Sequence, residues 1–169
     1  MDMKNTIILT IFFLFQNSNV CAQDKSEINQ KWTELKDQFK HKTEVVFEFT
    51  SKLQKSKKID KKELEKTDFY ASEFSKVFEN KVLNKEIVSK VKQANDLLNT
   101  HLVRILVNLE SDFKLKSQES IISLYDQLST IENLILADIM RYNEVCIKQN
   151  SKVLIFKTHD KNGSPSIEF

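Results

Sequence analysis

The sequence predicts an all-α protein: a long antiparallel bundle of three to four helices after an N-terminal signal helix. One observation is that the 169 residues include one Gly and one Pro, Gly163 and Pro165, so the rest of the chain lacks both helix breakers. A second is that apolar residues recur with a period near 3.5, as in helices that pack side by side. Charged residues make up 30% of the chain, but the net charge is only +2, which disfavours nucleic acid as a partner.

Residues 1–22 are expected to be an export signal. The apolar stretch Ile7–Phe15 is too short for the roughly 20 residues of a membrane-spanning helix. Val20 and Ala22 provide small residues at the two positions that signal peptidase reads. The alternatives are a retained N-terminal anchor and a lipoprotein modified at Cys21. We therefore expect export to the periplasm or another extracytoplasmic compartment, with attachment to the membrane if the segment is retained.

Residues 23–150 are expected to form the helical bundle domain, whose first helix runs from about Lys25 to Gln54. Apolar residues in this helix follow one another at steps of 4, 3, 4, 7, 3 and 4: Ile28, Trp32, Leu35, Phe39, Val46, Phe49 and Leu53. Lys42 fills the seven-residue gap in this seam. We expect its aliphatic stem to cover apolar surface while its ammonium group stays in water.

The most basic stretch of the chain, Lys52–Lys66, lies where the first helix should end. Ser56 to Asp60 is expected to be a turn, with Asp60 as the N-cap of the second helix. The residues of a possible interaction patch are Lys52, Lys55, Lys57, Lys58, Lys61 and Lys62. Lys-rich turns are usually only solvated, and the alternative is contact with an anionic membrane surface.

Two further seams predict the second and third helices. Apolar residues at helical spacing run from Phe69 to Leu83 and, after a break near Asn84, from Ile87 onward. The stretch Leu102–Leu109 is apolar on more than one face. We therefore expect it to be the most buried part of the bundle.

The last long helix is expected to begin after Ser117. Asp138 occupies one of its seam positions. Either Asp138 pairs across the bundle with a basic residue, or the helix rolls so that Ile139 takes its place. Cys146 lies beside this seam and is expected to be a buried small hydrophobe. Residues 151–169 are expected to form a C-terminal tail.

The sequence contains no motif typical of catalysis, a metal site or a cofactor. None of His41, His101 and His159 has a Glu three residues before it, as the pairs of a carboxylate-bridged di-iron bundle require. Zinc-type Cys spacing and the Gly-x-Ser-x-Gly nucleophile motif are also absent from the sequence. The sequence therefore favours a non-enzymatic protein without a cofactor.

The stretch from Leu102 to Asn150 resembles the C-terminal helical signature of the bacterial LemA family. The matching blocks are Leu106–Glu110, Leu115-Lys116, Leu124–Leu128, Glu132-Asn133 and Tyr142–Glu144. Their order, and the spacing between the last two, follow the family pattern. The chain departs from that pattern at Val45–Phe47 and Phe113, where the family has Pro, and at Leu134, where it has Arg.

The resemblance implies a long antiparallel helical bundle and an N-terminal segment that anchors the protein in a membrane. It brings little mechanism, because the biochemical role of the family is poorly defined. The family-signature candidates for a site are Glu132, Asn133, Tyr142 and Asn143. These residues either serve function directly or cross-link helices and turns.

Together these observations predict a LemA-like cell-envelope protein that acts as a protein-interaction or scaffold module. Its partner is expected to be another envelope protein or a second copy of the chain. One alternative is an enzyme or accessory subunit that uses a cleft near Glu132, Asp138 and Tyr142. Another is a protein that binds anionic membrane surfaces through Lys52–Lys66.

Overall fold

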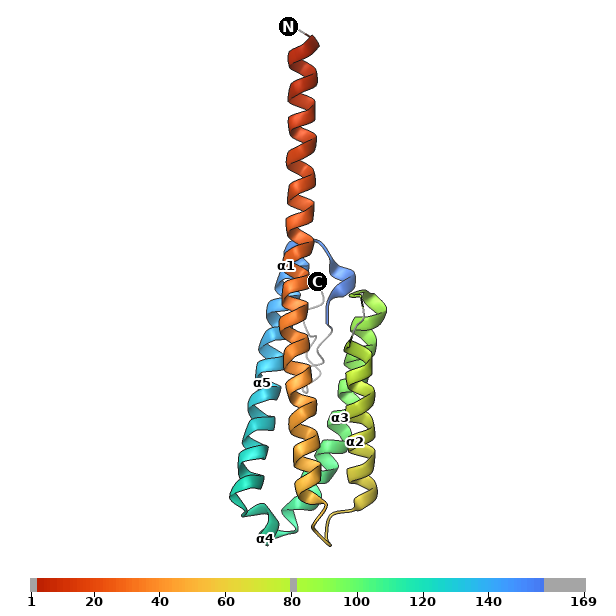
Figure 1. The fold of residues 1–169 in the computed structure, drawn as a ribbon, viewed down its shortest axis with the longest axis vertical. Coiled ribbons are helices and arrows are strands. Elements are labelled where there is room, and N and C mark those ends of the chain that lie inside the picture. Colours follow the sequence, from red (N-terminus) through yellow and green to blue (C-terminus); the bar gives the residue numbers. More distant parts are fainter. Residues whose placement is uncertain (1–2, 80–81, 157–169) are drawn as a thin grey trace, which may run out of the picture.

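The computed structural model describes residues 3–79 and 82–156, with side chains for residues 26–79, 82–152 and 154–156. The elements are α1 (Met3–Leu53), α2 (Lys61–Phe78), α3 (Lys85–Glu110), α4 (Phe113–Lys116), α5 (Glu119–Lys148) and the short 3₁₀ helix η1 (Lys152–Leu154). Every regular element in these ranges is helical, which confirms the predicted all-α bundle (Figure 1). Of the predicted tail, residues 157–169 lie outside the described residues.

The four long helices form a bundle in which one side stays open. α1 packs against α5 and α2, and α2 packs against α3. No comparable packing joins α3 to α5 in the described chain, and we call the side between these two helices the open side. The backbone of α1 continues well beyond the other helices at its N-terminal end (Figure 1).

Side-chain caps set the helix starts that the sequence predicted. The Asp60 carboxylate accepts the backbone N–H of Lys62 at 2.9 Å, which confirms it as the N-cap of α2. Asn84 accepts the N–H of Ile87 at 2.9 Å and begins α3. Each contact satisfies a backbone donor that has no partner within the helix.

The predicted seam of α1 is the core of the bundle. Its seven seam residues from Ile28 to Leu53 are all buried. Phe39 of α1 meets Phe74 of α2 edge to face, with ring centroids 5.1 Å apart, and Phe74 packs in the same way on Phe78 at 5.0 Å. Such contacts add to the burial of apolar area that holds the helices together.

The prediction that Leu102–Leu109 would be the most buried part is wrong for one of its faces. Leu102, Ile105 and Leu109 are buried, but Val103 and Val107 are 57% and 64% exposed. The physical reason is that α3 lies beside the open side, so a second apolar stripe on α3 has no helix to cover it.

The end of α5 turns the chain back onto the bundle. Asn150 has a φ of 56°, in the left-handed region that commonly ends helices. The N–H groups of Asn150 and Ser151 donate to the carbonyls of Ile147 and Cys146 at 2.9 and 2.7 Å. Phe156 is buried. The packed part of the chain therefore extends six residues beyond Asn150.

Candidate functional site

Lys42 lies in the interior of the bundle, with its side chain 0% exposed. Its ammonium group donates to Oδ1 of Asn95 and Oδ1 of Asn99, both at 2.6 Å, and pairs with Oε1 of Glu132 at 2.5 Å. The ring of Phe74 lies 5.9 Å from Nζ. The prediction of a solvated ammonium is therefore wrong, because this one side chain of α1 contacts side chains of α2, α3 and α5.

Each N–H donor of the buried Lys42 ammonium group has an acceptor. An ammonium group has three N–H donors, and two amide oxygens and one carboxylate oxygen accept them. Burial lowers the pKa of Lys42, and the carboxylate of Glu132 acts in the opposite direction. A buried charge of this kind is tolerated only while its partners are present. We call Lys42, Asn95, Asn99 and Glu132 the lysine centre.

A groove of about 360 Å³ lies on the open side, over the lysine centre. Asn95, Asn99 and Glu132 line it together with apolar side chains that include Leu136 and Ile139. Each Asn uses its oxygen for Lys42, and its NH₂ group has no hydrogen-bond partner among the described residues. The groove thus offers amide N–H donors and a carboxylate acceptor, which complement the C=O and N–H groups of a peptide backbone.

The four family-signature residues lie in four different environments. Glu132 belongs to the lysine centre, whereas Asn133 is exposed. Asn143 binds the backbone of Phe156, accepting its N–H at 2.9 Å and donating to its C=O at 2.9 Å. Asn143 therefore cross-links α5 to the segment that follows it.

Tyr142 belongs to an aromatic cluster near the N-terminal end of the described core. Its ring lies 6.0 Å from Trp32 and 5.6 Å from Phe156, measured between centroids. Its hydroxyl is buried without a hydrogen-bond partner among the described residues. Burial raises the pKa of Tyr142 and that of the neighbouring Cys146 thiol. Cys146 is buried, as predicted.

Asp138 does not pair across the bundle. Its carboxylate binds Nη1 of Arg141 on the same helix at 2.8 Å, and Ile139 packs against the core. Glu132 and Tyr142 are ten residues apart in a continuous helix, which separates them by about 15 Å along its axis. The structure therefore does not bring Glu132, Asp138 and Tyr142 together in one cleft.

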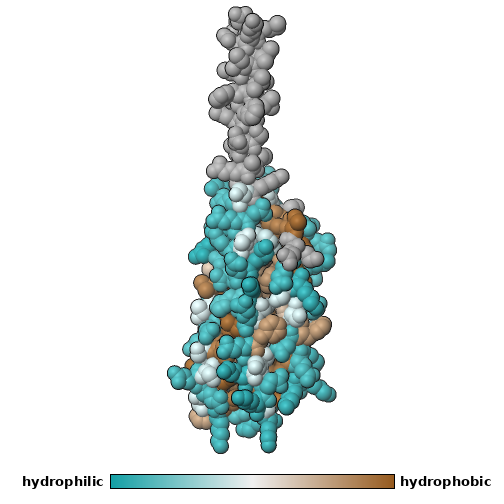
Figure 2. Space-filling view, viewed as in Figure 1, coloured by the Kyte–Doolittle hydropathy of each residue, from teal (hydrophilic) through white to brown (hydrophobic). Residues whose placement is uncertain are grey.

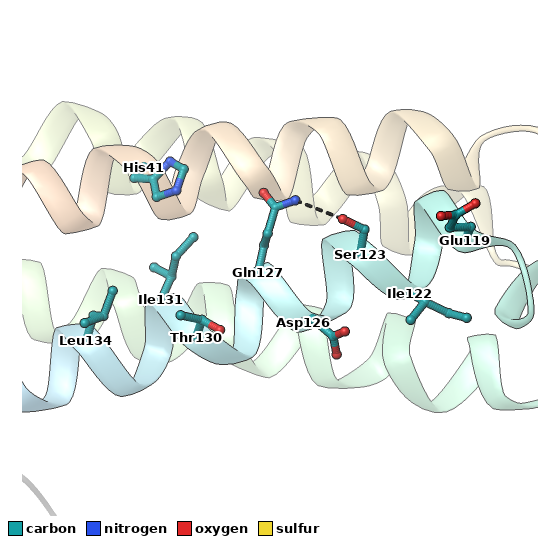
Figure 3. Close-up of a pocket in the computed structure, with 9 residues that line it drawn as sticks. All are labelled: His41, Glu119, Ile122, Ser123, Asp126, Gln127, Thr130, Ile131 and Leu134. Carbon is teal, nitrogen blue, oxygen red and sulfur yellow. Dashed lines mark hydrogen bonds between the residues drawn. The ribbon is translucent and has the colours of Figure 1, made fainter.

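A second, shallower hollow of about 460 Å³ lies between α1 and α5 (Figure 3). His41 comes from α1 and the other lining residues come from α5. Glu119 and His41 are at opposite ends of the hollow in Figure 3, and the hydrogen bond drawn there joins Gln127 to Ser123 at 3.3 Å. Its acidic side chains and its histidine thus do not form a common site.

The predicted lysine patch lies at the end of the bundle opposite the N-terminal extension of α1 (Figure 1). All six of its lysines are exposed. Ser56 in the same turn donates to Asp112 at 2.9 Å, which ties this turn to the start of α4. The patch and the lysine centre are therefore separate features.

Sequence reasoning missed Asn95 and Asn99 altogether. The sequence indicates only that these two Asn residues, being four apart, share a helix face. Reasoning also missed a cluster on α2 and α3, where Glu63 binds Lys66 at 2.8 Å and His101 at 3.0 Å. His101 stacks on Tyr70 with centroids 4.6 Å apart.

Two further features are absent from the described residues. No helix there is long and apolar enough to cross a membrane, and no group of three or more His, Cys, Asp or Glu side chains there could hold a metal ion.

Comparison with known families identifies the family of this chain. The model of the LemA family matches residues 31–160. No curated protein matches the chain. The matched range contains the whole lysine centre and continues past Phe156.

Proposed function

The chain belongs to the LemA family, and on this premise we propose that it is an exported docking protein of the cell envelope. The N-terminal part of α1 attaches the bundle to the cell envelope. The open side binds an acidic, amphipathic segment of another envelope protein. The helical continuation of α1 beyond the bundle supports the first part, because it gives the bundle a stalk. The surface of the open side supports the second.

The observation that carries the proposal is an exposed apolar strip beyond the groove. Val103 and Val107 follow Asn99 at intervals of four residues on α3, and Tyr125 precedes Glu132 by seven on α5. Residues at these spacings share a helix face. Val103, Val107 and Tyr125 are all exposed. We call these three residues the distal strip.

Exposed apolar side chains also occur elsewhere on the described surface, and the distal strip differs from them in sharing the helix faces of Asn99 and Glu132 in the lysine centre. On the face shown in Figure 2, the described surface is mostly hydrophilic, with apolar residues in separate patches. Contiguous exposed apolar side chains commonly mark binding surfaces in soluble domains. Phe113, at the start of α4, is a further exposed apolar side chain.

Charge indicates the chemistry of the partner. The lysine patch lies at the same end of the bundle as α4, which carries Lys114 and Lys116. A partner segment with apolar residues flanked by carboxylates would match both features. The lysines are better placed to contact such an acidic partner than to contact a membrane surface at the N-terminal end of the bundle. The bundle spans about 38 Å from Ile28 to Leu53, several times the reach of a screened charge.

The lysine centre also favours docking over catalysis. All three donors of Lys42 are used by the protein, and in the alternative cleft Glu132 is separated from Tyr142 by about 15 Å along α5. A rigid centre whose polar groups are all paired fixes the shape of the binding surface above it. A docking module needs such a fixed surface.

The test is site-specific photo-crosslinking of the full chain in its native envelope. A photoreactive residue replaces Val103 or Tyr125, and the control replaces Leu134, which is exposed on the side of α5 toward the other hollow. We expect the same adduct from both strip positions. The adduct should weaken with added salt and disappear in a Val107→Asp background. Equal adducts at Leu134, or an adduct with the mass of two chains, would contradict the proposal.

A further inference from the structure

The groove and the distal strip are joined by one continuous stripe of side chains on α3. Asn95, Asn99, Val103 and Val107 follow one another at intervals of four residues, so each neighbours the next on the helix surface. The two Asn residues line the groove, and both Val residues are exposed. A partner segment that lies on the distal strip and continues along α3 therefore reaches the two amides.

Asn95 and Asn99 are spaced like the carbonyl groups along one edge of an extended chain. Four residues of α3 rise by about 6 Å. In an extended chain, carbonyls that point to the same side recur every two residues, or about every 6.6 Å. Each Asn gives its Oδ1 atom to Lys42, which leaves its NH₂ group as a donor. The two amides can therefore donate to two carbonyls of one extended segment.

A helical partner segment cannot use these donors. Within an α-helix, the backbone C=O groups accept N–H groups from the next turn, and only those at the helix end remain free. The apolar face of an amphipathic helix would remove water from the two amides without replacing it. Burying a polar group without a hydrogen bond costs free energy. The groove therefore favours an extended segment over a helix.

The protein already contains one contact of this kind, beside the groove. The side-chain amide of Asn143 accepts the N–H of Phe156 and donates to its C=O, both at 2.9 Å. Phe156 lines the groove, and Ile155 before it is extended, with φ −69° and ψ 129°. One amide of α5 thus binds the backbone of a residue that follows an extended one, as the amides of α3 are spaced to do.

We propose that the partner segment crosses the lysine centre as an extended chain whose backbone is bound by Asn95, Asn99 and Glu132. This inference rests on the docking function proposed above. The two amides donate to carbonyls of the segment. Glu132 uses Oε1 for Lys42, and its Oε2 accepts an N–H of the segment. From Glu132 to Ile139 the groove extends about 10 Å along α5, and three extended residues cover that distance.

The test compares the partner residues that are cross-linked from two positions on one face of α5. In separate full-length chains in the native envelope, a photoreactive residue replaces Tyr125 of the distal strip or Leu136 of the groove, both exposed. The two positions are eleven residues apart, so they share a helix face and are separated by about 16 Å. Mass spectrometry identifies the partner residue in each adduct. An extended segment covers 16 Å with about five residues, whereas a helix needs about eleven, and we expect about five.

The outcomes distinguish this inference from the docking proposal. If Val103 and Tyr125 give no common adduct, the docking proposal is overturned, and the inference with it. If they give a common adduct but Leu136 gives none, docking stands and the extended segment over the lysine centre is overturned. A separation of about eleven partner residues between the Tyr125 and Leu136 adducts overturns it in the same way.

A second variant tests the amide itself. Asn99→Asp keeps an oxygen for Lys42 but replaces the NH₂ donor by an acceptor. Its control, Asn133→Asp, makes the same charge change at an exposed position of α5 that does not line the groove. With the photoreactive residue at Leu136, we expect at least about fivefold less adduct in Asn99→Asp than in the control. Circular dichroism first checks that both variants are folded, and equal adduct yields would overturn backbone binding by the amides.

Discussion

Removing Glu132 should destabilise the protein far more than removing the lysine that it pairs with. In Glu132→Ala, the ammonium of Lys42 stays inside the bundle with one donor unpaired and no counter-charge. Breaking a fully buried pair in this way costs about 3–5 kcal/mol. The Glu132 side chain is 39% exposed, so water can replace it in part, and we expect a loss of about 2–3 kcal/mol.

Lys42→Met gives the contrasting result. Methionine fills most of the volume of lysine without a charge, and the three acceptors left behind line or adjoin the groove, where water reaches them. We expect a loss of about 1 kcal/mol or less. Lys42→Met combined with Glu132→Ala should then be more stable than Glu132→Ala alone, with a coupling of about 2 kcal/mol. Urea unfolding at pH 7, followed by circular dichroism, measures all four proteins.

The pH dependence supplies an independent check on the same pair. The pKa of Lys42 in the folded protein lies below its ordinary value of 10.5. Between these two pKa values the unfolded chain binds more protons, so folding stability rises with pH. Without Glu132 the folded pKa falls further. The deficit of Glu132→Ala should therefore shrink as the pH is raised from 7 toward 10.5. Additive losses within about 0.5 kcal/mol, or a deficit independent of pH, would refute the reasoning.

Three further predictions concern residues outside the lysine centre. Hydrogen bonds from Lys66 and His101 hold the pKa of Glu63 at about 2. The stability this gives is complete above the ordinary pKa of 4.5 and is lost as the pH falls toward 2, so urea midpoints between pH 5 and 2 should fall less steeply in Glu63→Gln. Asn143→Ala should cost about 1–3 kcal/mol and speed amide exchange at Phe156, whereas exposed Asn133→Ala should stay within about 0.5 kcal/mol; equal losses would remove the role given to Asn143. Tyr142→Phe should leave the unfolding midpoint unchanged or raise it, since it removes a buried hydroxyl without a partner among the described residues, and a large loss would show that the hydroxyl has one.

The helices and their starts were readable from the sequence because both depend on local interactions. A 3.5-residue period shows which face of one helix is apolar, and the α1 seam from Ile28 to Leu53 is buried as that period predicted. A cap such as Asp60 or Asn84 acts on backbone donors two or three residues away. Neither property needs knowledge of the neighbouring helices.

The candidate site was not readable in this way. Lys42 was noticed only as a polar residue in an apolar seam, and Glu132 only as part of a family signature. Their connection spans 90 residues of sequence, and their partners Asn95 and Asn99 lie on a third helix. Periodicity also gave the wrong expectation for Val103 and Val107, because an apolar stripe is buried only if another helix covers it.

The sequence by itself thus determined that this chain forms long amphipathic helices, where they begin, and which family it belongs to. The tertiary structure alone decided that α3 and α5 leave one side open and that a single lysine charge lies beneath that side with three partners. The physical reason is that helix formation and amphipathicity follow from contacts within a few residues. The desolvation of a charge and its pairing depend on distances between separate helices, which no local pattern encodes.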